Sequence, residues 1–165
     1  PCSMSAIYDR FSGKEQLLHY MHRQGTEHAI AMIDEIQPWE APDSDLREVL
    51  PGALQVGLDM IRQFGGRRRA VLERMHADPL LLELELELRQ ALVASGIRFL
   101  LAYRHQITHP EPELAAGQAM RLMILVTEER HTAMSAPKAL QLSDAKFIEE
   151  TSRMVLGYLG IPPNN

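Results

Sequence analysis

The sequence predicts an all-α fold, and three observations lead to this prediction. Runs of β-branched residues between turn residues, which mark strands, do not occur in it. Apolar residues instead recur every three or four positions, as on one face of a helix. Proline and glycine interrupt this pattern at a few points and divide the chain into helix-sized segments. The 165 residues are 45% hydrophobic and 24% charged, which is typical of one globular domain and excludes intrinsic disorder.

The first long helix is expected from about residue 13 to residue 36. Ser12 and Glu15 have the spacing of a capping box, in which each side chain accepts a hydrogen bond from the other residue's backbone N–H. A linker that contains two prolines follows at residues 37–44.

A second helix is expected at about residues 45–64. Pro51-Gly52 is expected to bend this helix or to split off its first turn, because proline lacks the N–H that a helix interior requires. We expect Gly65-Gly66 to break the chain and a short basic helix to run from residue 67 to about residue 76.

The longest helix is expected at about residues 79–107, beginning after Asp78. Residues 83–88 alternate Glu and Leu, but both are strong helix formers and no β-branched residue occurs there. Leu82 and Leu86 widen the main apolar stripe, which predicts that much of this helix is buried.

Two helices complete the prediction. One is expected at about residues 112–134, after a proline-containing turn that ends the longest helix. Ser143 is expected to cap the last one, which runs to about Leu159.

Composition narrows the class of protein further. The one cysteine, Cys2, excludes an internal disulfide, and no apolar run reaches the ~18–20 residues that span a bilayer. We therefore expect a cytoplasmic protein with no membrane partner. The net charge is −5, but residues 1–24 contain three Lys or Arg against two Asp or Glu. A slightly basic end on an acidic chain suits contact with an anion.

The most informative segment lies at the N-terminal end of the chain, where a short helix of small residues precedes a two-residue turn and the first long helix. Small side chains let such a helix lie close to the floor of a DNA groove. Ile7 and Phe11, four residues apart, are spaced to fasten it to the rest of the molecule. The residues expected to contact DNA are Ser3, Met4, Ser5, Ala6, Tyr8, Arg10 and Lys14.

This segment resembles the second half of the DNA-binding domain of TetR-family (tetracycline-repressor-like) transcriptional regulators. The family pattern is Val-Ser-x-x-x-Leu-Tyr-x-x-Phe-x-x-Lys-Glu-x-Leu, and Cys2 stands here in place of the usual Val. The positions that match are Ser3, Ile7, Tyr8, Phe11, Lys14, Glu15 and Leu17. The resemblance implies that residues from about 3 to 10 are the recognition helix, and that Tyr8 and Lys14 bind the DNA backbone. The alternative is that Tyr8 and Phe11 are core aromatics of a helical hairpin.

The family has two further helices, on the order of 40 residues, before its recognition helix. Because the sequence begins at Pro1, we expect the start of the natural chain to be missing, and we expect the chain as it stands to bind DNA poorly. A natural Met-Pro start, trimmed by an aminopeptidase, is the alternative. The expected domains are residues 1–24, the C-terminal part of a helix-turn-helix domain, and residues 25–165, a helical domain for effector binding and dimerisation.

The last two predicted helices carry apolar residues on more than one face, and a second apolar face calls for a partner. We expect a homodimer in which these helices and their symmetry mates form a four-helix bundle, as in the TetR family. The residues expected at this interface are Leu122, Leu125, Phe147, Met154, Val155 and Tyr158. In the alternative, both faces are internal to a monomer.

Nine methionines are many for this length, and methionine adapts its shape to varied apolar ligands. By analogy with the TetR-family pocket, the residues expected to bind a ligand are Met60, Ile61, Met75, Phe99, Tyr103, Met120, Met123 and Thr127. Such a pocket would take a mostly apolar small molecule, with Tyr103 and Thr127 as its polar anchors. The alternative for most of these residues is an ordinary core position.

No enzyme motif is evident in the sequence, and no catalytic residues, cofactor or metal are expected. Glu15, His19 and His22 share one helical face, but such a cluster is usually only solvated. The expected function is therefore a ligand-responsive, dimeric DNA-binding regulator, a repressor acting on a palindromic operator. The alternative is a helical dimeric ligand-binding or interaction module without DNA-binding activity.

Overall fold

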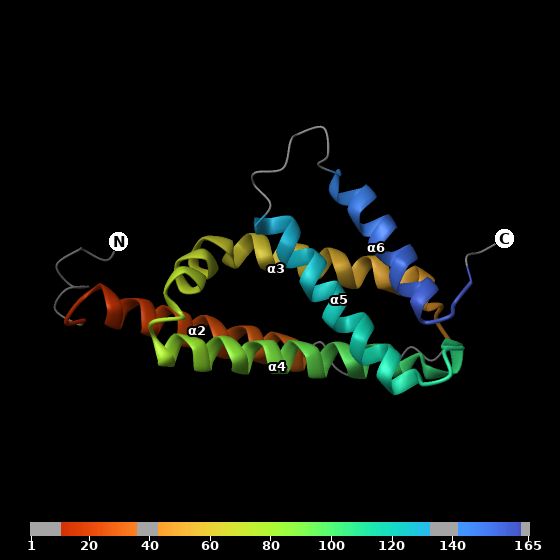
Figure 1. Cartoon of the computed structure of the whole chain (residues 1–165), viewed down its shortest axis with the longest axis horizontal. Coiled ribbons are helices and arrows are strands. Elements are labelled where there is room, and N and C mark those ends of the chain that lie inside the picture. The colour runs from red at the N-terminus through yellow and green to blue at the C-terminus, as the bar shows by residue number, and fades with distance from the viewer. Residues whose placement is uncertain (1–10, 36–42, 133–141, 163–165) are drawn as a thin grey trace. The chain divides into compact units, whose positions relative to one another are not determined.

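The computed structural model describes residues 11–35, 43–132 and 142–162. In these ranges it contains α-helices and one short 3-10 helix but no strand, which confirms the all-α fold class (Figure 1). The elements are α2 (Lys14–Glu35), α3 (Leu46–Arg74), α4 (Pro79–Ala102), η1 (Arg104–Gln106), α5 (Pro112–Thr132) and α6 (Asp144–Tyr158). Within the described part of the chain, no helix combines the length and the apolar character that a membrane span requires.

The predicted break at Gly65-Gly66 is wrong. α3 continues through both glycines, so the two helices expected at residues 45–64 and 67–76 are one helix. A glycine in a helix interior costs about 1 kcal/mol relative to alanine, which lowers helix stability without preventing the helix. Pro51 likewise lies inside α3 and does not split off its first turn. Its missing N–H removes one hydrogen bond, and the helix continues beyond it.

The start of α2 also differs from the prediction. The backbone N–H of Ser12 donates to Oε1 of Gln16 at 2.9 Å, so Gln16 takes the place that the capping box assigned to Glu15. The predicted cap of α6 is confirmed, because the Ser143 hydroxyl accepts a hydrogen bond from the Lys146 N–H at 3.2 Å.

α4 ends at Ala102, five residues before the predicted end, and η1 follows it. Beyond this end, η1 contacts the start of α3. Oε1 of Gln106 accepts a hydrogen bond from the Leu46 N–H at 2.9 Å, and its Nε2 donates to the Ser44 carbonyl at 2.8 Å. Gln106 thereby satisfies one of the N–H groups that the first turn of α3 leaves without a helical partner.

The chain forms two compact units. Unit 1 comprises Pro1–Ile36 and Gly66–Leu92, and unit 2 comprises Gln37–Gly65 and Val93–Asn165. The predicted domain boundary after residue 24 falls inside α2. The two units instead meet along the chain after Ile36, Gly65 and Leu92. Both α3 and α4 contribute residues to each unit, which no reading of local sequence pattern anticipated.

Unit 1 is built from α2, the end of α3 and the first half of α4. Its buried hydrophobic residues are Ala29, Val71, Leu81 and Leu84. Three polar residues, His22, Thr26 and Glu85, are buried in the same unit. The core of unit 1 is thus smaller and more polar than a purely apolar core.

Unit 2 holds the larger core, to which α3, α4, α5 and α6 all contribute. α5 and α6 pack against each other (Figure 1). The buried members of the core are Leu46, Leu50, Leu54, Leu58, Phe99, Leu100, Tyr103, Ile107, Ala115, Ala116, Ala119, Met123, Phe147, Ile148, Val155, Leu159 and Ile161. Gly96 of α4 lies so close to Met120 of α5 that a side chain at Gly96 would overlap the Met120 thioether.

The end of α6 is tied to the loop that precedes α5. The Leu159 carbonyl accepts hydrogen bonds from the N–H groups of Thr108 and His109, both at 3.2 Å. Gly160 then turns the chain with a φ of 75°, a conformation that glycine adopts without strain, and its carbonyl accepts from the Thr108 hydroxyl at 2.5 Å. These bonds hold the C-terminal end of α6 in place.

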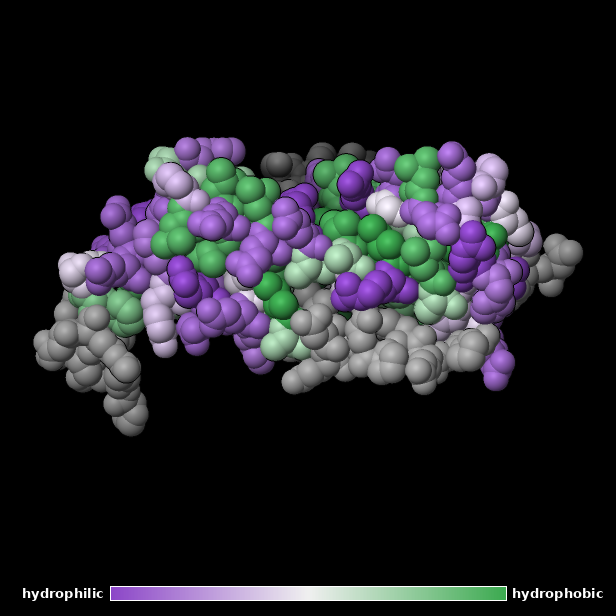
Figure 2. Space-filling model, turned by 90° about the horizontal axis from the view of Figure 1, so that it is seen from below, coloured by the Kyte–Doolittle hydropathy of each residue, from purple (hydrophilic) through white to green (hydrophobic). Residues whose placement is uncertain are grey.

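Several large hydrophobic side chains are exposed. Figure 2 shows one face on which hydrophobic residues lie among hydrophilic ones. Leu82 and Leu86 of α4 are 38% and 48% exposed, so the expectation that this helix is buried on much of its circumference is wrong at these two positions. The buried side of α4 in unit 1 instead carries Leu81, Leu84 and Glu85.

Candidate functional site

The candidate DNA-contacting segment is described only from residue 11 onward. Ser3, Met4, Ser5, Ala6, Tyr8 and Arg10 lie outside the described residues. Lys14 is the first residue of α2 and is exposed, where a cation can reach a phosphate. The N–H groups in the first turn of any helix have no partner within the helix and also favour an anion.

Phe11 packs on α2 itself. Its ring lies 5.3 Å from the ring of Tyr20, centroid to centroid, with an angle of 49° between the planes. A tilted aromatic pair of this kind stabilises the chain by packing and by the attraction between ring edge and ring face. The sequence predicted a fastening role for Phe11, but it did not identify Tyr20 as the partner. The spacing of nine residues matches neither helical nor strand periodicity and offered no signal.

A hydrogen bond joins α2 to the start of α4 within unit 1. Nε2 of His19 lies 2.5 Å from Oδ2 of Asp78. Oδ1 of the same carboxylate accepts from the N–H groups of Leu80 and Leu81 in the first turn of α4, at 3.2 and 3.3 Å. The hydrogen bond from His19, with the backbone N–H groups of Leu81 and Leu80, lowers the pKa of the Asp78 carboxyl below its ordinary value of 3.8.

The His19–Asp78 hydrogen bond involves one member of the Glu15, His19 and His22 cluster, which the sequence analysis considered as a metal site. Glu15 is exposed, His19 is bound to Asp78 and His22 is buried, so the three side chains have different surroundings. No group of three potential metal ligands occurs among the residues that the structure describes. His19 therefore has a defined structural partner that the sequence pattern did not identify.

No family model, curated protein or solved structure matches the chain.

Most of the predicted ligand-binding residues lie in or against the core of unit 2. Phe99, Tyr103 and Met123 are buried members of that core, and Met120 packs against it. Met60 and Ile61 are half-buried on α3, whereas Met75 belongs to unit 1. The structure thus brings the α4 and α5 residues of the set into one core and assigns Met75 to the other unit.

Both predicted polar anchors have partners within the chain. The Tyr103 hydroxyl lies 3.0 Å from the Ser44 hydroxyl, and the Tyr103 ring meets that of Phe99 edge-on at 5.7 Å. The Thr127 hydroxyl donates to the Met123 carbonyl one turn earlier in α5, at 2.6 Å. These bonds satisfy the two hydroxyls inside the core, where an unpaired polar group is costly.

The six residues predicted at a dimer interface separate into two groups. Leu125, Met154 and Tyr158 are 61%, 41% and 40% exposed, and Leu122 is half-buried. Phe147 and Val155 are buried in the core of unit 2 and do not belong to an exposed face. Helical geometry explains the separation, because Val155 lies one residue beyond Met154 and points about 100° away from it.

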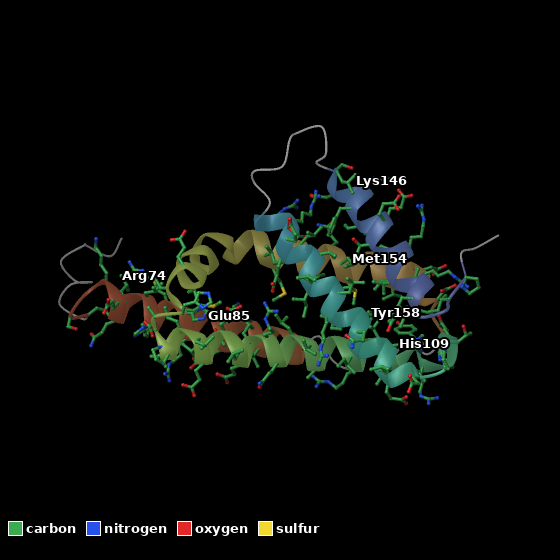
Figure 3. The ribbon with its side chains drawn as sticks, viewed as in Figure 1. Arg74, Glu85, His109, Lys146, Met154 and Tyr158 are labelled. Atoms are coloured by element: carbon green, nitrogen blue, oxygen red, sulfur yellow. The ribbon has the colours of Figure 1, made fainter. Side chains whose placement is uncertain are left out.

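Exposed apolar residues occur on both α5 and α6. Leu114 is 50% exposed and lies on the same side of α5 as Leu125, three turns earlier. Figure 3 shows Lys146, Met154 and Tyr158 along α6, with His109 beside Tyr158. The ring centroids of His109 and Tyr158 are 5.4 Å apart. Leu114, Leu125, Met154 and Tyr158 are named here the α5–α6 outer face.

Charged residues border this face. Lys146 pairs with Glu149 and Glu150, both at 2.9 Å, and Arg153 pairs with the same two carboxylates. The Lys146 ammonium is the main cause that lowers the pKa of the Glu149 and Glu150 carboxyls. Exposed pairs of this kind add little stability, but they leave the α6 surface beside Met154 nearly neutral in charge.

Proposed function

We propose that this protein is a DNA-binding transcriptional regulator of the TetR kind. The match of residues 2–17 to the family pattern is the observation that carries the proposal. Small residues, an aromatic pair and a Lys-Glu helix start occur there together at fixed spacing. The exposure of Lys14 at the start of α2 supports a phosphate contact, because that position combines an exposed cation with the positive end of a helix.

The proposal includes a homodimer formed through the α5–α6 outer face. Four large apolar side chains are exposed on these two packed helices, and burying them in a dimer would remove apolar surface from water. A two-fold dimer also fits a palindromic operator, whose half-sites lie about 34–36 Å apart or a multiple of that distance.

An apolar small-molecule effector completes the proposal. It would enter unit 2 among the Phe99, Met120 and Met123 side chains. The effector would change DNA affinity only to the extent that it binds one arrangement of the dimer better than the other. Repression and a cytoplasmic location belong to the same proposal, since such a regulator acts on an operator in the DNA.

A gel-shift titration tests the DNA-binding proposal. Full-length protein would be titrated against duplex DNA taken from beside its own gene, with a shuffled duplex of equal composition as the control. The proposal expects tighter binding to the native duplex and an affinity that falls as salt rises, because phosphate contacts release counterions. Binding that ignores sequence, or no binding at all, would contradict it.

The alternative is a helical dimeric module that binds a ligand or partner without DNA. The α5–α6 outer face favours this alternative equally, because it requires a dimer but no recognition helix. A self-associating full-length protein that fails the gel-shift test would support it.

A further inference from the structure

The hydrogen bond between His19 and Asp78 joins two segments that are 59 residues apart in the sequence. Both residues are only about one quarter exposed, at 27% and 25% of their side-chain surface. The lowered pKa of the Asp78 carboxyl means that it is ionised near neutral pH and acts only as an acceptor. Nε2 of His19 therefore carries the proton and donates it to this bond.

Asp78 has a second role in the same place. Its other oxygen accepts from the N–H groups of Leu80 and Leu81, so the carboxylate caps α4 while it binds α2. The capping oxygen fixes the side chain against the end of α4, and Pro79 at the first helical position restricts the backbone there. α2 is thus attached to a rigid point of α4 rather than to a mobile side chain.

The position of His19 on α2 gives the bond its importance. His19 is five residues beyond Lys14, a rise of about 7.5 Å along the helix axis. In Figure 1, α2 and the first half of α4 run in the same direction from this end. The contact with Asp78 therefore lies within the first two turns of α2.

We propose that the His19–Asp78 hydrogen bond is a latch that strengthens DNA binding by fixing the first turns of α2 on α4. This inference rests on the proposed function, since it concerns the orientation of the segment that would contact DNA. A closed latch holds Lys14 and the first turn of α2 in one arrangement, so that less conformational entropy is lost when DNA binds. An open latch leaves α2 free to reorient and weakens DNA binding.

Hydrogen exchange of backbone amides tests the latch without DNA. The variants are D78S, which keeps a capping oxygen but loses the second one, and H19L, which loses the donor. Each is expected to speed exchange in the first half of α2 about tenfold, the size expected for one charge-assisted hydrogen bond. H19Q keeps an N–H donor at a similar reach and is expected to stay within about twofold of the wild type.

Two comparisons distinguish loss of the His19–Asp78 bond from a general loss of stability of the protein. H28L changes an exposed histidine on the same helix and serves as the matched control. Amides of α5 and α6 are the internal reference, and their exchange should not change. The double variant D78S/H19L should exchange no faster than either single variant, because both remove the same bond. Effects that multiply in the double variant would overturn the proposal.

DNA affinity provides the second measurement, on the same full-length variants. D78S and H19L are expected to bind the native duplex about threefold to tenfold more weakly, while H19Q binds like the wild type. If the wild type shows no sequence-preferring binding, the proposed function fails and the role of the latch in DNA binding fails with it. If the wild type binds and D78S binds equally well, only the latch is overturned.

Discussion

Arg130 on α5 donates a hydrogen bond to the carboxylate of Asp144, the first residue of α6, at 2.7 Å. The same guanidinium group donates to the Leu142 carbonyl at 2.8 Å and lies over the Phe147 ring, 4.7 Å from its centroid. Arg62 of α3 binds the other oxygen of Asp144. Three helices of unit 2 therefore meet at one carboxylate, and this is where the start of α6 is positioned.

Replacing Arg130 should destabilise the protein. R130M keeps the length of the side chain but removes two hydrogen bonds and the cation–π contact, and Arg130 is only 23% exposed. We expect the free energy of unfolding to fall by about 1–3 kcal/mol in a urea titration. The control is R104M, which breaks the pair of Arg104 with Glu113, where both side chains are more than half exposed. No measurable loss is expected there, and equal losses in both variants would contradict the assignment.

Asp144 should also make stability depend on pH. The hydrogen bonds from Arg62 and Arg130 lower the pKa of its carboxyl below the ordinary value of 3.8. The unfolded chain therefore binds this proton more readily, so the stabilisation is present above about pH 4 and is lost as the pH falls through the folded pKa. D144N should be less stable than the wild type at pH 7, and the difference should shrink toward pH 3. A difference that stays constant across this range would refute the prediction.

The close approach of α4 and α5 at Gly96 should admit a side chain only if Met120 shifts. G96A would place a methyl group against the Met120 thioether, and we expect a loss of about 1–3 kcal/mol from overpacking. M120A should make room for that methyl group, so the double variant should lose less than the sum of the two single variants. G52A is the control, because nothing lies within 4 Å of a side chain added at that exposed position of α3. It should raise stability by about 0.5–1 kcal/mol, since alanine is the better helix former.

The α5–α6 outer face should carry the self-association. L125D introduces a charge at a side chain that is 61% exposed, so the monomer fold should remain intact. If the face is a dimer interface, sedimentation should show a dissociation constant at least about tenfold higher, because the charge would have to be buried. V56D is the matched control at an exposed apolar residue of α3. Wild-type protein that sediments as a monomer at all concentrations would rule the interface out.

Substitutions in the proposed DNA-contacting segment should fall into two classes, those that weaken binding to every operator and those that change the preference among operators. K14Q and Y8F remove phosphate contacts and should weaken binding to all operator variants by a similar factor, and K14Q should reduce the salt slope by about 1. Changes at Met4 or Ser5 should instead alter the preference among operators, because these residues would face the bases. The same factor at every operator for all four changes would contradict this division.

Local sequence was sufficient for part of the fold. The helical class, the approximate extents of α2, α5 and α6 and the Ser143 cap follow from patterns within one or two helical turns. The same patterns misplaced the end of α4 and divided α3 at Gly65-Gly66. Helix propensity gives the free-energy cost of placing a residue in a helix. Tertiary packing determines whether other interactions offset that cost.

The sequence by itself determined that this protein is helical, that its first long helix begins near Lys14, and that its last helices carry more apolar residues than one face requires. Only the tertiary structure decided which of those apolar residues are exposed, since it buries Phe147 and Val155 and leaves Leu125 at the surface. It alone also paired His19 with Asp78 and Arg130 with Asp144. Helix formation depends on neighbours along the chain, whereas these contacts depend on how separate helices pack, which no local pattern encodes.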